Sequence, residues 1–365
     1  MRLVLSLFLY SVPAVSWAAA DPFAGVAASS APAAAPEEHS WARRFFSDNF
    51  GVRRELMSEF GAANHVRSSS RQSAGFEVLK KFSTETRTVA ALNFQGRLVR
   101  RDRFTGSPND MEGMQRQGWF FEYHNAYADL YDPLGGVGAL SARAGRFYVP
   151  FGLNLQTDTH GTLLQLSNER NFGFERDWYA GVWGSAGEEL RYDAYYLAGS
   201  GYDLKYWGQS GLGAARLSLA SKYANEHGIE GGLSFLGGQR LAPGVVDTLR
   251  SGLDGRLRRP VPTGTLSWTT ELSGGEDRPA SVFTQLHQLE YLHSSRRWGL
   301  ASQYRRFWME GRGSDGSLFG EAGWYFRNDV GNSNLHWLKL NVERQMERQE
   351  GPLALIVKLQ YYRYW

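Results

Sequence analysis

Charged side chains recur at every second position in several stretches of this sequence. Stretches such as TLRSGLDGRLRR and TLSWTTELS alternate leucine or tryptophan with charged or polar residues. Side chains of one parity that line an aqueous passage would bias which ions cross it, because fixed charges act strongly at close quarters. The candidates for such a pore lining are Arg97, Arg191, Arg216, Arg250, Asp254, Arg256, Glu271 and Lys339.

Acidic and basic residues share this parity. A row of arginines along the passage would favour anions, whereas the acidic residues on the same faces would oppose this preference for anions. The simpler expectation is a balanced, water-filled lining in which the charges pair, and the preference for cations or anions stays open. The opposing acids are Glu77, Asp193, Glu230, Asp254, Glu271, Glu321 and Glu343.

The sequence gives less support for a catalytic site or a metal site than for a charged pore lining. The sequence has eight histidines and no cysteine. His293 and Ser295 form the closest Ser/His spacing, but a catalytic triad is recognised by geometry and not by nearness in sequence. His227 and His287 are expected as polar residues of a turn and a strand, since no spaced His/Cys cluster suggests a metal. No Cys-x-x-Cys-His motif is present to attach haem. We therefore predict no enzyme activity, no metal and no cofactor.

The residues between the charges are apolar, which predicts strands with one apolar and one polar face. A soluble sandwich would bury the apolar faces in a core, whereas an outer-membrane barrel turns them toward lipid. The expected strands are longer than the ~5–6 residues usual in globular sheets. Aromatic residues crowd their ends, as in the girdles of membrane barrels, at 119–121, 178–179, 307–308, 324–326 and 361–365. The prediction is an all-β fold, a transmembrane antiparallel β-barrel of the outer-membrane type.

The strands can be counted back from the end of the chain. We expect them at 74–83, 87–101, 118–131, 139–152, 177–186, 190–199, 213–223, 228–237, 249–258, 264–274, 281–293, 299–309, 317–328, 334–347 and 352–365. Residues 50–64 are a further candidate, with a periplasmic amphipathic helix as the alternative. Bacterial single-chain barrels have even strand numbers, which favours the strand and a barrel of about 16. With the termini in the periplasm, the long connections fall on the outer side, as such barrels require.

The two ends of the sequence also indicate export to the outer membrane. Residues 1–20 have Arg2, an apolar core and a small-x-small site at Ala18 and Ala20, the pattern of a signal peptide. Residues 21–49 are an Ala/Pro-rich periplasmic linker, and the barrel is expected over 50–365. A formal net charge of +3 gives no electrostatic case for nucleic acid.

The last residues, PLALIVKLQYYRYW, alternate up to a terminal aromatic. This end resembles the C-terminal signal of bacterial outer-membrane barrels at Val357, Leu359, Tyr361 and Trp365, and departs from it at Arg363. The resemblance implies that the barrel assembly machinery binds the chain through Trp365. In a closed barrel this last strand would pair with the first.

The stretch AGRFYVPFG resembles the G-x-F-x-x-P-F-G motif of the phosphate-selective porin family and its relatives. The matching residues are Gly145, Phe147, Pro150, Phe151 and Gly152. The motif precedes the longest loop, 153–176, between the fifth and sixth strands, which in sixteen-stranded porins folds inward and narrows the pore. The resemblance implies that this loop forms the constriction, with the candidates Asp158, His160, Glu169, Arg170, Glu175 and Arg176. Phosphate sites of the family use clustered basic residues, and the mixed charge of this loop departs from that pattern.

These patterns predict a porin in the outer membrane of a Gram-negative bacterium, a passive diffusion channel for small hydrophilic solutes or ions. Its expected partners are outer-membrane lipid and those solutes, with a homotrimer left open. The first alternative is a structural barrel that acts as a sleeve for an envelope partner in electron transfer or export. The second is an outer-membrane enzyme such as a phospholipase.

Overall fold

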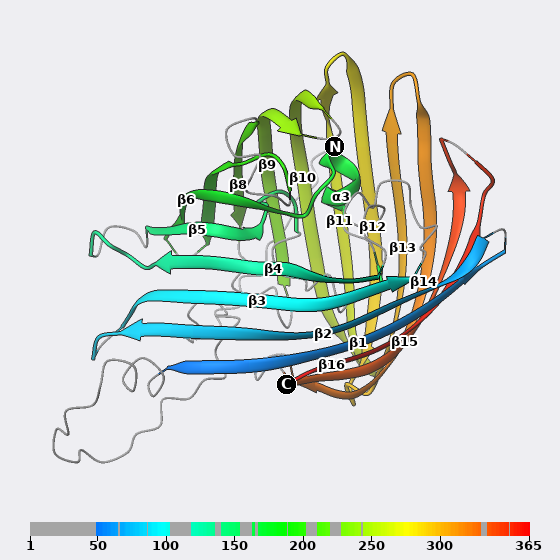
Figure 1. The fold of residues 1–365 in the computed structure, drawn as a ribbon, viewed down its shortest axis with the longest axis horizontal. Coiled ribbons are helices and arrows are strands. Elements are labelled where there is room, and N and C mark those ends of the chain that lie inside the picture. Colours follow the sequence, from blue (N-terminus) through cyan, green and yellow to red (C-terminus); the bar gives the residue numbers. More distant parts are fainter. Residues whose placement is uncertain are drawn as a thin grey trace, which may run out of the picture.

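The computed structural model describes residues 49–64, 66–85, 87–102, 118–135, 140–153, 163–164, 167–187, 189–201, 210–219, 228–241, 244–329, 334–349 and 351–365. These residues form a closed antiparallel barrel in which each strand pairs with its neighbours in sequence. The sixteen strands are β1 (Phe50–Ala63), β2 (Val66–Ser83), β3 (Thr88–Asp102), β4 (Gly118–Leu130), β5 (Ser141–Tyr148), β6 (Arg176–Ala186), β7 (Leu190–Leu197), β8 (Gly211–Leu219), β9 (Gly228–Leu241), β10 (Val245–Val261), β11 (Gly264–Asp277), β12 (Ala280–His293), β13 (Trp298–Met309), β14 (Gly313–Asp329), β15 (Asn334–Glu347) and β16 (Leu355–Tyr364). The near wall, β1 to β5, crosses the far wall, β9 to β14, steeply because the strands are tilted (Figure 1).

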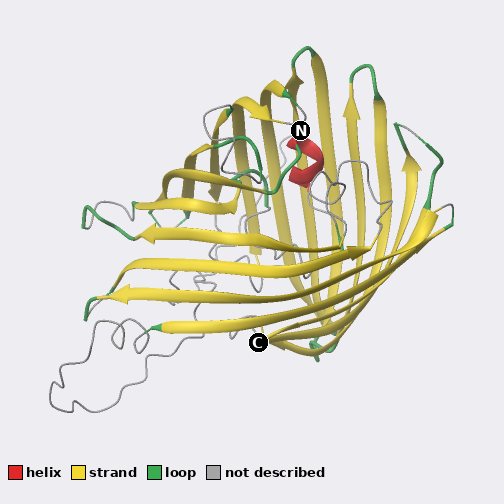
Figure 2. Cartoon of the chain, in the orientation of Figure 1, coloured by secondary structure: helices red, strands yellow, loops and turns green. Residues whose placement is uncertain are grey.

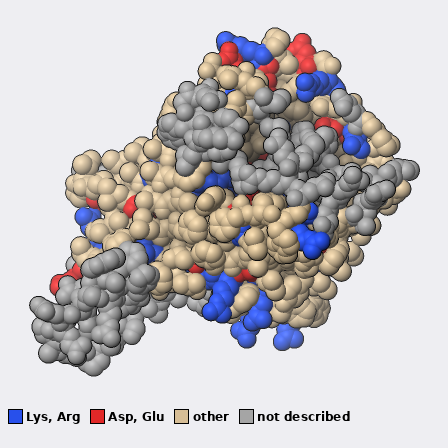
Figure 3. Space-filling model, viewed as in Figure 1, with Lys and Arg blue, Asp and Glu red and all other residues tan. Residues whose placement is uncertain are grey.

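Alternation along each strand gives the barrel an apolar outside and a polar inside. Outward residues such as Val52 and Leu253 are 55% and 57% exposed, whereas inward Arg97 is 0% exposed. Most of the surface over the near wall is uncharged, and charged side chains gather toward the ends of the molecule (Figure 3). An apolar belt facing outward around a polar lumen is the arrangement of a membrane barrel.

The barrel is closed by the two ends of the described chain. β1 pairs with β16 from Glu55↔Tyr364 to Ala63↔Ile356. The ladder extends to the last residue, since the Arg54 amide donates to the Trp365 carbonyl at 2.8 Å and the Trp365 amide donates to the Arg54 carbonyl at 3.1 Å. Residues 50–63 are therefore a strand, as predicted, and not a helix.

Some predicted strand limits were wrong. β2 begins at Val66 rather than at residue 74, and β10 runs from Val245 to Val261, well beyond 249–258. β5 ends at Tyr148, so residues 149–152 leave the sheet instead of completing a strand. Because neighbouring strands are antiparallel throughout the barrel, β5 and β7 end on the same side as β11 and β13, which are followed by tight turns (green in Figure 2). Among the described residues, no helix is long and apolar enough to cross a bilayer.

Candidate functional site

The chain turns from the barrel wall toward the lumen after β5, and the two glycines of the predicted motif have different places in this path. Gly145 lies within β5 with a φ of +133°, and a Cβ there would lie 2.2 Å from the Ala126 carbonyl oxygen of the neighbouring strand. Gly152 follows β5 with a φ of +66°, and a Cβ there would lie 3.0 Å from a Glu271 carboxylate oxygen. Both positions require glycine, because L-residues rarely adopt a positive φ. Gly145 therefore permits close approach of β4 and β5, and Gly152 lies in the turn that directs the following segment inward.

The segment that follows contains α3 (Ser167–Phe172), which lies against the inner wall. Glu271 of β11 holds this segment at two points. One carboxylate oxygen accepts a hydrogen bond from the Leu153 amide at 2.9 Å, and the other accepts one from the hydroxyl of Ser167, the first residue of α3. Arg250 of β10 donates to the Asn171 side-chain oxygen at 2.9 Å and to the Asn171 carbonyl at 3.0 Å. Two predicted pore charges thus serve to hold this segment.

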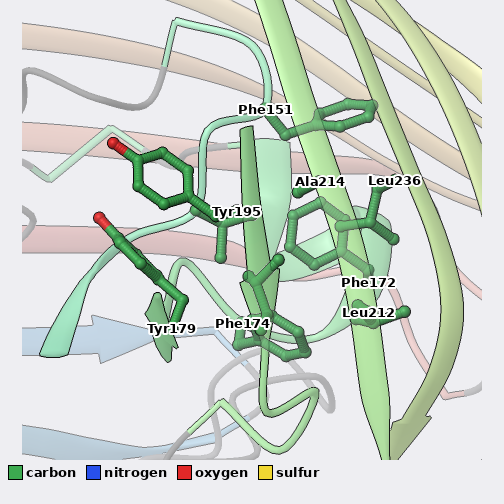
Figure 4. Close-up of a cluster of buried hydrophobic side chains, with 10 residues drawn as sticks. Phe151, Phe172, Phe174, Tyr179, Tyr195, Leu212, Ala214 and Leu236 are labelled. Atoms are coloured by element: carbon green, nitrogen blue, oxygen red, sulfur yellow. The ribbon is translucent and has the colours of Figure 1, made fainter. Parts of the chain in front are cut away.

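An aromatic cluster also holds this segment against the wall. Phe172 of α3 contacts Phe151 and Phe174 with ring centroids 5.7 and 5.1 Å away. The three rings pack on inward Leu212, Ala214 and Leu236, with Tyr179 and Tyr195 nearby (Figure 4). These side chains are buried inside the barrel, which gives the segment an apolar base as well as polar anchors.

Arg170 of α3 and Arg305 of β13 concentrate positive charge under the helix. Arg170 donates to Asp315 at 3.2 Å, and burial lowers the pKa of its guanidinium, a shift that Asp315 opposes. Arg305 is 2% exposed, lies 5.6 Å from the centroid of the Phe319 ring, and is repelled by Arg170. Among the residues that the structure describes, no carboxylate forms an ion pair with Arg305, although Glu343, Glu169 and Asp315 attract it from further away, and its Nε atom has no hydrogen-bond partner.

The other inward charges form close pairs, either between neighbouring strands or across one intervening strand. Arg216 lies 2.6 Å from Asp254, and Lys339 lies 2.9 Å from Glu321. The remaining pairs are Arg97 with Glu55 at 2.5 Å, Arg250 with Asp277 at 2.8 Å, and Arg256 with Glu230 at 3.5 Å. Arg191 lies on β7 on the same face as Asp193. Such pairing leaves little net charge along most of the wall.

The predicted constriction residues divide into three groups. Glu169 and Arg170 lie on α3, inside the barrel. Glu175 and Arg176 lie at the wall, where Arg176 donates to Asn125 at 3.2 Å and its guanidinium lies 3.8 Å from the centroid of the Tyr148 ring. Asp158 and His160 lie outside the described residues.

Sequence patterns had not singled out Arg305, Asp315 or Asn171. Arg305 stands in QYRRFW, where an adjacent arginine of the opposite parity obscures the alternation. The inward position of Asp315 depends on how far β14 extends, which the sequence underestimated. Asn171 falls on no strand period because it belongs to a short helix. A period-two search alone could not find these residues.

The nearest Ser/His pair has the geometry of a turn. His293 Nδ1 lies 2.9 Å from the Ser295 hydroxyl, both residues are solvent-accessible, and the His293 ring stacks on Trp298 with centroids 4.8 Å apart. Within the described ranges, no group of three metal-binding side chains occurs. Neither arrangement offers a site comparable with the charged lumen.

Comparison with solved structures identifies the class of fold. No protein-family model and no curated protein matches the sequence. OprB of Pseudomonas putida matches with a TM-score of 0.63 at 11% identity, over 89% of this chain and 96% of that one. An anion-selective porin from Comamonas acidovorans matches with a TM-score of 0.57 at 9% identity, over 87% of this chain and 99% of that one.

A third structure, a loop-deletion mutant of the Vibrio cholerae outer-membrane protein OmpT, matches with a TM-score of 0.53 at 9% identity, over 87% of this chain and 100% of that one. At such identities the likeness concerns the fold. That fold, with its apolar belt and polar lumen, is the outer-membrane β-barrel of porins from Gram-negative bacteria. The predicted resemblance to porins is confirmed at this level, and a particular relation to phosphate-selective porins stays a prediction.

Proposed function

We propose that the protein is a porin, a passive diffusion channel for small hydrophilic solutes or ions in the outer membrane. The observation that carries this proposal is the segment containing α3, held against the inner wall by Glu271, Arg250 and an aromatic cluster. A fixed segment inside a barrel reduces its open cross-section, and charges at that narrowest section bias which ions pass. Solute size would then be limited by α3 and the wall opposite to it.

Planar bilayers test this proposal directly. Purified full-length protein should give discrete conductance steps after insertion, because each open barrel adds one aqueous path. A matched preparation that is heat-denatured before addition should give none. Silent bilayers that demonstrably contain folded protein would contradict the channel.

Arg305 should make the channel prefer anions, since among the described residues no carboxylate forms an ion pair with this cation beneath α3, and Glu343, Glu169 and Asp315 act on it only from further away. Replacing Arg305 with Gln should shift the reversal potential in a salt gradient toward that of a cation-preferring pore. Arg312→Gln removes the same charge from the exposed tip of the β13–β14 hairpin and serves as the control. Equal shifts in both variants would mean that Arg305 has no special place in the ion path.

The sleeve alternative predicts a different result in the same experiment. Several inward polar side chains are covered by other residues of this chain: Arg97 and Gln360 are 0% exposed, and Gln303 and Asn341 are 1% exposed. This packing belongs to the wall itself and names no occupant. The bilayer experiment separates the two, because an occupied sleeve conducts only when its occupant leaves.

We propose no catalytic role. The closest Ser/His pair is part of an exposed turn at the periplasmic end of the barrel, away from the outer leaflet where a phospholipase would meet its substrate. Binding of the assembly machinery at Trp365 also stays a proposal, supported by the place of that residue at the periplasmic edge of β16.

A further inference from the structure

Three arginines lie close together on the outward face at the periplasmic end of the barrel. Arg327 of β14 pairs in the sheet register with His336 of β15, and His336 pairs with Arg363 of β16. Arg363 in turn pairs with outward Leu56 of β1, and Arg54 lies two residues nearer the periplasm on the same face of β1. Arg54, Arg327 and Arg363, called here the arginine patch, are exposed. Lys and Arg side chains gather at the lower edge of the molecule (Figure 3), where the chain ends (Figure 1).

The arginine patch lies at the level of the periplasmic aromatic girdle. The Arg363 guanidinium lies 4.7 Å from the centroid of the Trp365 ring. His336 contacts the rings of Phe326 and Tyr361, with centroids 4.6 and 5.3 Å away. Because girdle aromatics mark the membrane interface, these guanidinium groups lie at the depth of lipid headgroups.

No acidic side chain neutralises the patch within the described ranges. None of its three arginines forms an ion pair with a described residue, and this includes Asp329 and the terminal carboxylate of Trp365. The two charges that act on His336 are those of Arg363 and Arg327, and both repel its protonated form. The patch therefore keeps its positive charge.

The outer end of the same wall has a different charge pattern. There Arg278 lies 2.9 Å from Glu276, and Arg306 lies 2.8 Å from Glu347. Acidic and basic side chains accordingly lie side by side at the top of Figure 3. Charge is balanced at the outer end and positive at the periplasmic end.

The positive charge also belongs to one sector of the barrel. On β4, β8 and β9 the outward residues near the periplasmic ends are apolar and exposed, namely Leu130, Leu219 and Ile229. In contrast, exposed Arg259 on β10 and the exposed turn residues 296 and 297, both arginines, continue the basic surface toward β14. Among the described residues, positive charge at this depth is therefore concentrated on the side from β10 to β1.

We propose that the arginine patch binds the phosphate groups of anionic phospholipids in the periplasmic leaflet of the outer membrane. A guanidinium donates two parallel hydrogen bonds to a phosphate, so arginine suits this group better than lysine does. Strands lie about 4.8 Å apart, so the patch extends about 14 Å along the membrane boundary from β14 to β1. Because its charge is not neutralised, a headgroup with net negative charge is favoured over a zwitterionic one. This inference does not depend on whether the barrel conducts.

An acidic periplasmic protein fits the patch less well than a lipid does. The three arginines lie on the face that also carries exposed Leu56, Leu338 and Leu359, and lipid covers this face in a membrane barrel. A soluble partner would instead meet the turns that project into the periplasm.

Lipid binding by the purified full-length protein tests the site. Phosphatidylglycerol is titrated into detergent micelles that contain phosphatidylcholine, and the bound lipid is identified by native mass spectrometry. The wild-type protein should retain phosphatidylglycerol in preference. Each arginine beside an anionic headgroup contributes about five-fold in affinity, so loss of all three should weaken binding on the order of a hundred-fold. The variant is Arg54→Gln/Arg327→Gln/Arg363→Gln.

The matched control removes three arginines from the outer end and should keep the wild-type affinity. It is Arg278→Gln/Arg306→Gln/Arg312→Gln. Equal weakening in both triple variants would assign the effect to net charge, and unchanged binding in the patch variant would assign the arginines to another partner. Either result would overturn the proposal. Each variant is first checked for a folded band on an unheated gel. If the triple patch variant does not fold, Arg327→Gln alone should weaken binding about five-fold, and wild-type affinity in that variant would equally overturn the site.

Discussion

Replacing Glu271 with Ala is expected to release the α3 segment and raise the single-channel conductance. Glu271 accepts hydrogen bonds from the Leu153 amide and the Ser167 hydroxyl, and bonds to a charged group contribute about 1.5–3 kcal/mol each. Loss of both bonds, about 3–6 kcal/mol in total, would raise the population of the released segment by roughly a hundred-fold to ten-thousand-fold, at 1.4 kcal/mol per factor of ten. Bilayer recordings should show larger and noisier open levels.

Asp254→Ala is the matched control for this variant. Asp254 is the register partner of Glu271 on β10 and also faces inward, but it bonds Arg216 rather than the segment. The Asp254→Ala variant removes one inward carboxylate and its ion pair with Arg216 but no bond to the segment, so it reports the effect of the lost lumen charge without release of the segment. Equal conductance in the two variants and the wild-type protein would show that the segment does not limit the pore.

Replacing Gly145 with Val is expected to prevent assembly of the barrel. The β-branched side chain would have to adopt a φ of +133° with its Cβ 2.2 Å from the Ala126 carbonyl oxygen. Strain at such a backbone angle costs about 1–3 kcal/mol by itself, and the clash with β4 adds to it. Because β5 pairs with β4 over only a few residues, from Ala126↔Arg146 to Leu130↔Ala142, the wall has little pairing there to resist separation.

The readout is the fraction of outer-membrane protein that migrates as a folded band on an unheated gel. Ala144→Val introduces valine one position earlier and is the control, because Ala144 is exposed on the outer face of β5. This variant should leave the folded fraction unchanged. A folded Gly145→Val protein with normal yield would show that β4 and β5 can move apart at this point without loss of the barrel.

Secondary structure and barrel class were determined by the sequence itself, for a local reason. The side-chain period of a strand is two, so alternation in TLSWTTELS or HWLKLNVE reports which face is polar without knowledge of the neighbouring strands. The glycine motif was found through its resemblance to a family motif, and the structure supplies the local reason for it, a positive φ at Gly145 and Gly152. The same alternation fixed the parity of Arg97, Arg216 and Lys339, which the structure buries on the inner side.

Only the tertiary structure decided what the inward residues do. Glu271 and Leu153 are far apart in sequence, and their hydrogen bond exists because the barrel closes and the segment after β5 turns inward. The pairing of Arg216 with Asp254, and the absence of an acidic partner for Arg305 among the described residues, likewise depend on strand register and on the position of α3. Alternation reports the face on which a side chain lies, whereas its partners are set by contacts between strands.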